Sequence, residues 1–238
     1  MNAKNRRIFE VLAQRYPDAH CELLHETPFQ LLISTVLSAQ TTDVQVNKVM
    51  PAVYERLPDA KAWLSLSLGE IEETIKSIGL YKSKARHIYA LVRMLLEEWG
   101  GEVPRTLEEL TKLPGVGRKT ANVVLANAYG VPSIAVDTHV FRLANRIGIA
   151  HEKNVAKTEA ALQKALDPDL WIQAHHLLIF HGRALCTARS PKCDLCPIRD
   201  DCDYDKSQRA LARAALRQKA KKSKEPSPRV PSREKGRP

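Results

Sequence analysis

Residues 113–120 read LPGVGRKT and separate two segments that have the apolar spacing of helices. Glycine adopts positive φ easily and has no Cβ, so Gly115 and Gly117 allow main-chain N–H groups to approach a phosphate oxygen where the next helix begins. Lys119 then lies in the first turn of that helix, and Asp137 follows it along the chain. The stretch predicts a helical hairpin that grips a phosphate backbone and carries a reactive amine. Taken alone, it is also compatible with an ordinary helical corner that bears a surface lysine.

Most of the chain before residue 209 has apolar residues three and four positions apart, which is the spacing of one helix face. Helix starts are expected at Thr27, Ser67 and Thr106, where a hydroxyl cap precedes proline or precedes glutamate by three residues. No segment alternates as a β-strand does, so the sequence predicts an all-α protein. The clearest apolar faces comprise Ile8, Val11 and Leu12; Phe29, Leu32, Ile33, Val36 and Leu37; and Ile88, Leu91, Val92, Leu95, Leu96 and Trp99.

The length of 238 residues and the hydrophobic content of 44% suffice for one large or two small domains. No apolar run approaches the roughly 18 residues that span a bilayer, and the N-terminal segment lacks the apolar core of a signal peptide. We therefore expect a cytoplasmic protein that does not contact a membrane.

The net charge of +10 comes mostly from the C-terminal end of the chain. Residues 209–238 contain 11 Lys and Arg against 2 Asp and Glu, whereas residues 1–208 contain 26 against 25. Because segment 209–238 has few large apolar residues, it cannot bury enough surface to offset its ordering entropy, and we expect a basic disordered tail. The tail either raises non-specific affinity for nucleic acid or acts as a solubilising extension. A DNA-binding surface of the folded part must then be a local basic patch.

Four of the five cysteines fall within 17 residues, in the pattern Cys-x6-Cys-x2-Cys-x5-Cys. Disulfides are uncommon inside cells, whereas four thiolates this close together can converge on one metal centre. Zinc sites often use two close pairs, but only one CxxC pair is present, which favours an iron–sulfur cluster over zinc. The expected ligands are Cys186, Cys193, Cys196 and Cys202, and Cys21 is expected to be a buried free thiol.

Five motifs in this order resemble the endonuclease III family of base-excision DNA glycosylases, within the helix-hairpin-helix superfamily. They are LSAQTTD at residues 37–43, IGLYKSKA at 78–85, LPGVGRKTANVV at 113–124, VDTH at 136–139, and the cysteine pattern. The resemblance spans roughly residues 1 to 205. Each motif alone is only moderately specific, but all five in order leave little room for coincidence.

The resemblance implies an all-α enzyme of two lobes, with DNA crossing the cleft between them. The first lobe would be a six-helix barrel over residues 22–132, and the second would hold a 4Fe-4S cluster and combine residues 1–21 with residues 133–208. We expect this cluster to serve structure and DNA contact rather than the chemical step. The residues expected to contact DNA are Gln40, Leu80, Gly115, Val116, Gly117, Arg118, Arg189 and Lys192, of which Arg189 and Lys192 are alternatively ordinary solvated charges.

The resemblance also implies a reaction: the removal of oxidised pyrimidines from duplex DNA, followed by cleavage of the abasic site by β-elimination. A stacked base cannot be cut in place, so the nucleotide is flipped out, and Gln40 and Leu80 are the implied residues that fill the gap. Lys119 is the implied nucleophile that attacks C1′ and forms a Schiff base. Asp137 would assist proton movement and stabilise charge on the sugar. An ordinary lysine is almost wholly protonated at neutral pH, so the site must favour the neutral amine through desolvation and nearby positive charge.

Alternative functions remain at this point. An adenine-mismatch glycosylase shares the fold and the cluster spacing but lacks the lysine of the hairpin helix. A non-catalytic DNA-binding module would not need Lys119 together with Asp137, and an iron–sulfur electron carrier would leave the hairpin unexplained. We expect a monomer that acts in the nucleoid on double-stranded DNA containing damaged bases or abasic sites. The preferred lesion and the role of His139 are left open by the sequence.

Overall fold

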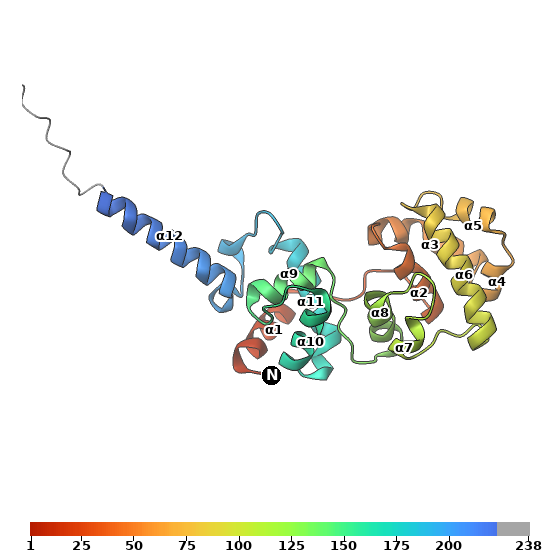
Figure 1. Cartoon of the computed structure of the whole chain (residues 1–238), viewed down its shortest axis with the longest axis horizontal. Helices are drawn as coiled ribbons and strands as arrows, with labels where there is room; N and C mark the ends of the chain where they lie inside the picture. The colour runs from red at the N-terminus through yellow and green to blue at the C-terminus, as the bar shows by residue number, and fades with distance from the viewer. Residues whose placement is uncertain (223–238) are drawn as a thin grey trace, which may run out of the picture.

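The computed structural model describes residues 1–222, and within this range every regular element is a helix. The prediction of an all-α protein is therefore confirmed. The helices form two lobes that lie side by side, with one long C-terminal helix projecting from the second lobe (Figure 1). No helix in residues 1–222 combines the length and the apolar character that crossing a membrane requires.

The first lobe holds the hairpin and has a core around the fully buried Trp63. The central helix of this lobe, α6, packs against α2, α4 and α5. The helices of the lobe are α2 (Pro28–Leu37), α3 (Asp43–Arg56), α4 (Ala60–Leu64), α5 (Leu68–Thr74), α6 (Tyr81–Trp99), α7 (Leu107–Leu110) and α8 (Arg118–Tyr129). The hairpin is the turn between α7 and α8, so the helix-hairpin-helix expected from the sequence is present.

The second lobe combines the beginning of the chain with its later part. Ile8 and Leu12 of the first helix belong to the same core as Leu143 and Leu178, so residues far apart in sequence share one apolar interior. Its helices are α1 (Ala3–Arg15), α9 (Thr138–Ile147), α10 (Val155–Ala165) and α11 (Trp171–Ala184), followed by single 3-10 turns at Cys193–Leu195 and Arg199–Asp201. We propose that the two cores correspond to two domains with boundaries near residues 21 and 132.

The three helix starts expected from hydroxyl caps are present. The Thr27 hydroxyl accepts a hydrogen bond from the N–H of Gln30 at 3.2 Å, and that of Thr106 accepts one from Glu109 at 3.2 Å. Ser67 forms a complete capping box with Glu70. These local signals fix where α2, α5 and α7 begin, and hence how far each helix reaches into the first core.

The expectation of a disordered tail from residue 209 is wrong for residues 209–222. These residues form the end of α12 (Asp203–Lys222), which extends away from the second lobe (Figure 1). The reason is composition: alanine, leucine, arginine, glutamine and lysine all favour helix, so this segment can be helical without burying a face. Leu211 and Leu216 accordingly remain exposed on α12. The remaining part of the expected tail, residues 223–238, lies outside the described residues.

Gly148 lies against Asp203, the first residue of α12, where this helix packs on the second lobe. This glycine ends α9 at φ 87°, and a Cβ there would lie 1.8 Å from Oδ2 of Asp203, whose carboxylate pairs with Lys4 at 2.8 Å. We expect Gly148→Ala to lower the free energy of unfolding by about 2–4 kcal/mol. The new Cβ would displace Asp203 from Lys4, and the strain of an alanine at positive φ would add to this loss. Urea denaturation measures the change.

The matched control is Gly130→Ala. Gly130 ends α8 at φ 64°, but a Cβ there would have no neighbour within 4 Å. This substitution should cost only the strain of a left-handed alanine, about 1 kcal/mol. Equal losses for the two variants would contradict the steric role assigned to Asp203.

Candidate functional site

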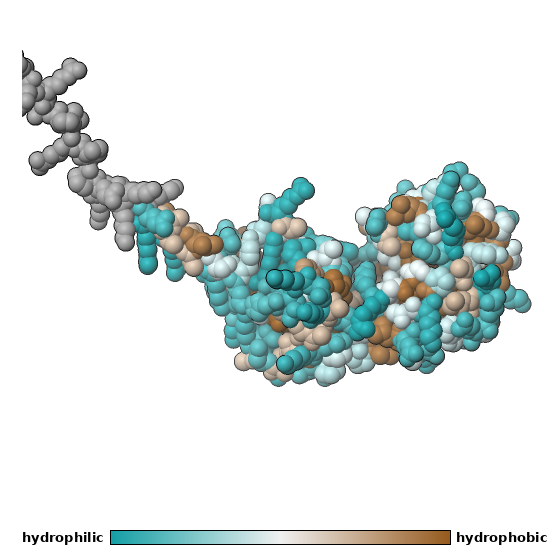
Figure 2. Space-filling model, in the orientation of Figure 1, coloured by the Kyte–Doolittle hydropathy of each residue, from teal (hydrophilic) through white to brown (hydrophobic). Residues whose placement is uncertain are grey.

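A polar cleft runs between the two lobes and contains both residues predicted to be catalytic. Figure 2 shows a notch between the lobes, and a cavity of about 230 Å³ there is lined by residues from each of them. Lys119 enters from α8 of the first lobe, and Asp137 enters from the start of α9 in the second lobe. The tertiary structure thus brings together an amine and a carboxylate that belong to different cores.

Asp137 serves as the N-cap of α9. Its Oδ1 accepts a hydrogen bond from the N–H of Val140 at 2.8 Å. Since one carboxylate oxygen is engaged in this way, the helix holds the group in a fixed orientation at the edge of the cleft. Nearby, Nδ1 of His139 accepts a hydrogen bond at 3.1 Å from Arg142, so His139 has a structural partner.

Asp43 is a second carboxylate in the cleft that the sequence analysis did not assign a role. It begins α3, directly after the Gln40 turn, and Arg183 of α11 pairs with it at 3.0 Å and also with Glu22. Burial raises the pKa of Asp43, the negative charge of Asp137 adds to this rise, and the positive charge of Lys119 opposes it. Asp43 therefore lies within electrostatic range of both predicted catalytic residues, and Arg183 bridges the two lobes at this point.

His175 and His176 form the back of the cleft. Nδ1 of His175 lies 2.7 Å from the carbonyl oxygen of Ala135, and Nε2 of His176 lies 2.9 Å from Oδ1 of Asn127. These carbonyl oxygens can only accept, so Nδ1 of His175 and Nε2 of His176 each carry the proton. Burial lowers the pKa of both rings, so both are neutral at pH 7. Cys21 lines the same cleft, and it is half-buried rather than fully buried as expected.

The two glycines of the hairpin have different roles. Gly115 has φ 81°, and a Cβ there would lie 2.9 Å from Cβ of His87, so both conformation and space require glycine. Gly117 has an ordinary φ of −90° as the N-cap of α8, and a Cβ there would have no neighbour within 4 Å. No side chain caps the N-terminus of α8, so its first N–H groups can donate to a phosphate.

Two predicted hairpin contacts are engaged within the protein instead. Val116 is buried in the first core, and its N–H donates to the carbonyl of Leu113 at 3.0 Å, so it offers neither side chain nor donor to DNA. The guanidinium of Arg118 makes a bidentate pair with Glu159 of α10, with the shortest contact at 2.7 Å. Arg118 therefore joins the lobes through Nε and Nη2, while its side chain remains about half exposed.

Gln40 and Leu80 are the only residues other than glycine with positive φ in residues 1–222, at 54° and 59°. Leu80 precedes α6, and its side chain is 60% exposed, which excludes the alternative of a core leucine. Gln40 follows α2 and is also exposed. Both side chains are thus free to contact a ligand, on turns whose backbone is strained.

The four cysteines of the array line one narrow apolar pocket between α9, α11 and the turns that follow. Burial raises the pKa of the Cys196 thiol to about 11, so its thiolate is disfavoured unless a positive metal centre compensates for the lost hydration. Four sulfur donors around an apolar cavity fit an iron–sulfur cluster. The residues that would hold it are Cys186, Cys193, Cys196 and Cys202.

Arg146 orders the loop between the first two cysteines, and the sequence analysis missed it. From α9 it donates to the carbonyl oxygens of Thr187 and Ala188 at 2.7 and 2.8 Å. Arg189 and Lys192 lie on this loop, and both are exposed. The loop thus presents two cations on a backbone that Arg146 fixes by hydrogen bonds, as a phosphate-binding loop would.

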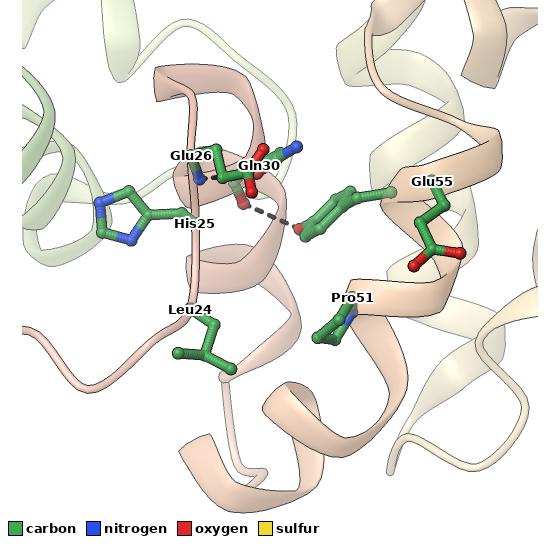
Figure 3. Close-up of a pocket in the computed structure, with 7 residues that line it drawn as sticks. Leu24, His25, Glu26, Gln30, Pro51 and Glu55 are labelled. Carbon is green, nitrogen blue, oxygen red and sulfur yellow. Dashed lines mark hydrogen bonds between the residues drawn. The ribbon is translucent and has the colours of Figure 1, made fainter.

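A further hollow of about 400 Å³ lies between α2 and α3 of the first lobe, as Figure 3 shows. The hydroxyl of Tyr54 donates to the carbonyl of Gln30 at 2.8 Å across it. Its lining includes no residue that the sequence analysis singled out, whereas the interlobe cleft contains Lys119 and Asp137. The cleft is therefore the candidate active site.

Two regions of the chain match known protein families. Residues 33–168 match the family described as HhH-GPD superfamily base excision DNA repair protein. Residues 186–202 match the iron-sulfur binding domain of endonuclease III. The first match covers both the hairpin and Asp137, and the second covers all four cysteines.

Similar proteins and structures cover most of the chain. It is 47% identical over 192 residues to endonuclease III of Bacillus subtilis (strain 168), covering 80% of this chain and 88% of that protein. It is 47% identical over 202 residues to endonuclease III of Escherichia coli (strain K12), covering 85% and 96%. A solved structure of a trapped endonuclease III–DNA covalent intermediate, an estranged-adenine complex, matches with a TM-score of 0.81 at 47% identity, covering 87% of this chain and 99% of that one.

The buried His176 should make the stability of the protein depend on pH in acid. Its pKa falls from 6.5 to about 3 in the folded protein because of burial, with smaller contributions from His175 and His20. Between these values only the unfolded chain takes up the proton, so stability is intact above pH 6.5 and is lost as the pH falls towards 3. His176→Gln removes this uptake and keeps a donor for Asn127. On acidification below pH 6.5, the variant should lose about 1.4 kcal/mol per pH unit less than the parent.

Urea denaturation at several pH values between 7 and about 5 measures this difference. The exposed His151 supplies the control, because His151→Gln should leave the acid dependence of the parent unchanged. Parallel stability profiles for His176→Gln and the parent would contradict the assignment.

Proposed function

Because this chain belongs to the endonuclease III family of base-excision DNA repair proteins, we propose that Lys119 and Asp137 are the groups that perform its reaction in the interlobe cleft. As a member, the protein is a DNA glycosylase with AP-lyase activity, it binds DNA, and it holds a 4Fe-4S cluster. The observation that carries the residue assignment is the meeting of Lys119 and Asp137 in one cavity between the two cores.

Lys119 acts as the nucleophile. Its neutral amine attacks C1′ of the flipped nucleotide, the bond from C1′ to the base breaks, and the base leaves with its electron pair and takes up a proton. Ring opening of the sugar gives a Schiff base between Nζ and C1′. Loss of a proton from C2′ then expels the 3′ phosphate by β-elimination, and water releases the lysine. Lys119 is exposed in the DNA-free protein, so the bound nucleotide supplies the desolvation that the reaction needs.

Asp137 assists this sequence from a fixed position. With Oδ1 held by the N–H of Val140, its carboxylate stabilises the positive charge that develops on the sugar as the base leaves. The same carboxylate can accept a proton from the attacking amine and return it in later steps. Its fixed orientation means that little reorganisation is needed when charge appears.

DNA binding uses surfaces on both lobes. The open N-terminus of α8 at Gly117 grips one phosphate, while Arg189 and Lys192 on the cysteine loop contact the backbone from the other lobe. Gln40 and Leu80 enter the duplex and fill the space that the flipped nucleotide leaves. The cluster supports this geometry by fixing the cysteine loop, and no chemical step is assigned to it.

The substrates we propose are oxidised pyrimidines and abasic sites in double-stranded DNA, acted on by a monomer in the nucleoid. Support comes from the polar cleft, where donors and acceptors are available for the carbonyl and N–H groups of a damaged pyrimidine. An adenine-mismatch glycosylase remains the second candidate class, but Lys119 in the first turn of α8 favours the lyase.

Lys119→Gln tests the nucleophile. The variant should lose covalent trapping to an abasic duplex in the presence of borohydride, and strand cleavage should fall below detection, because an amide cannot form a Schiff base. DNA binding should change little. Trapping on a panel of duplexes with oxidised pyrimidines, oxidised purines or adenine mismatches identifies the substrate class. Lys61→Gln, at an exposed lysine of α4, controls for the lost charge. Undiminished nicking by Lys119→Gln would refute the assignment.

Asp137→Asn tests the carboxylate separately. Asparagine keeps an oxygen that can cap α9, so the fold and the binding of DNA should be retained. Single-turnover base removal should slow by about a hundredfold or more, since proton transfer and charge stabilisation are both lost. Normal chemistry combined with a large loss of binding would show that Asp137 has only a structural role.

A further inference from the structure

Lys84 is a buried lysine for which the proposed reaction has no role. It lies in the first turn of α6 with only 4% of its surface exposed. Its Nζ donates to the carbonyl oxygen of Leu37 at 2.7 Å and to Oγ1 of Thr41 at 2.7 Å, and no carboxylate within the described residues forms an ion pair with it. Burial lowers the pKa of Lys84. An ammonium group is costly to bury, so its two hydrogen bonds must compensate for lost hydration.

These two bonds span the turn that carries Gln40. Leu37 is the last residue of α2, and Thr41 directly follows Gln40, so Nζ connects the two ends of this turn. The carbonyl of Leu37 also lies at the negative end of the α2 dipole, which favours a cation there.

The same lysine belongs to the turn that carries Leu80. The N–H of Lys84 donates to the carbonyl of Leu80 at 3.1 Å, the first hydrogen bond of α6. The two turns also lie close together: a Cβ added to Gly79, which precedes Leu80, would lie 3.4 Å from Oγ1 of Thr41. Lys84 therefore links, through its main chain and its side chain, the two turns whose side chains we propose to enter the duplex.

Both turns need such a link. Gln40 and Leu80 have positive φ, a conformation that is strained for residues with a Cβ and persists only where the surroundings enforce it. Leu80 has no side-chain cap bond that would hold it. A hydrogen bond from Gln45 to the carbonyl of Ser77 at 3.2 Å also joins the region, but it is exposed to solvent, whereas the bond from Lys84 to Leu37 is buried and that to Thr41 is partly buried.

We propose that Lys84 is a positioning residue that holds the Gln40 and Leu80 turns in their strained conformations before DNA binds. The two side chains then reach the duplex already in place, and less of the binding free energy is spent on ordering them. This inference rests on the proposed function of Gln40 and Leu80. Loss of the Lys84 bonds should impair opening of the duplex and leave the chemistry at Lys119 intact.

Lys84→Met tests the proposal, because methionine keeps a long buried side chain and removes the donor. Single-turnover removal of thymine glycol from a duplex should slow by about tenfold or more, as expected for loss of the bonds that enforce two strained residues. Borohydride trapping on a single-stranded abasic oligonucleotide, which needs no opening of a duplex, should remain at the level of the parent. A purely structural role would lower both activities together, and that result would overturn the proposal.

Two further variants support the design. Thr41→Val removes one acceptor and leaves the bond to Leu37, so it should give a smaller loss with the same dependence on the substrate. It carries the test if Lys84→Met does not fold. Lys61→Met removes an exposed lysine of α4 and should leave both activities unchanged.

A fluorescent base that brightens when it unstacks, placed opposite the abasic site, reports opening of the duplex. Its fluorescence should rise less with Lys84→Met than with the parent.

Leu80→Ala and Gln40→Ala separate this inference from the function it rests on. Both should slow reaction on the duplex and not on the single strand. If both react normally on the duplex, the filling role itself fails. If they are slow while Lys84→Met is as fast as the parent, only the role of Lys84 fails.

Discussion

The bidentate ion pair between Arg118 and Glu159 is the interaction on which the geometry of the active site depends. Arg118 begins α8 directly before Lys119, and Glu159 belongs to the lobe that supplies Asp137. The carboxylate of Glu159 is almost fully buried, so separating the pair would leave a charge without compensation. The position of Lys119, the proposed nucleophile, relative to Asp137 is thus fixed by a contact between lobes, and Arg183 adds a second such contact to Asp43.

The cleft between the lobes and the cysteine pocket of the second lobe have opposite environments. The cleft is polar and open, with the Lys119 amine and the carboxylates of Asp43 and Asp137 along its lining. The cysteine cavity is apolar, because four thiolates around iron need little further charge and a rigid surround. Arg146 links the two regions, since it holds the loop that runs from the half-buried Cys186 to the exposed cations Arg189 and Lys192.

Local sequence signals predicted the elements and several of the site residues. Hydroxyl caps located helix starts such as Ser67, and the cysteine spacing indicated a metal centre. Local signals do not reveal the partners of a residue within the fold. Arg118, expected to contact DNA, pairs with Glu159, and Val116, expected to contact DNA, is packed into the core. The end of α12 was missed because burial was considered without the helix propensity of its alanines and leucines.

The sequence by itself determined an all-helical chain, the hairpin and the four-cysteine array, since these depend on local periodicity, caps and spacing, and its motifs indicated which groups to expect in the reaction. Only the tertiary structure decided which of these groups meet. Lys119 and Asp137 belong to different cores, and Lys84 binds the carbonyl of Leu37, 47 positions earlier in the chain. Such contacts are set by packing between segments distant in sequence, for which one chain carries no local signal. The strained φ angles of Gln40 and Leu80 are likewise visible only in three dimensions, because the surrounding structure enforces them.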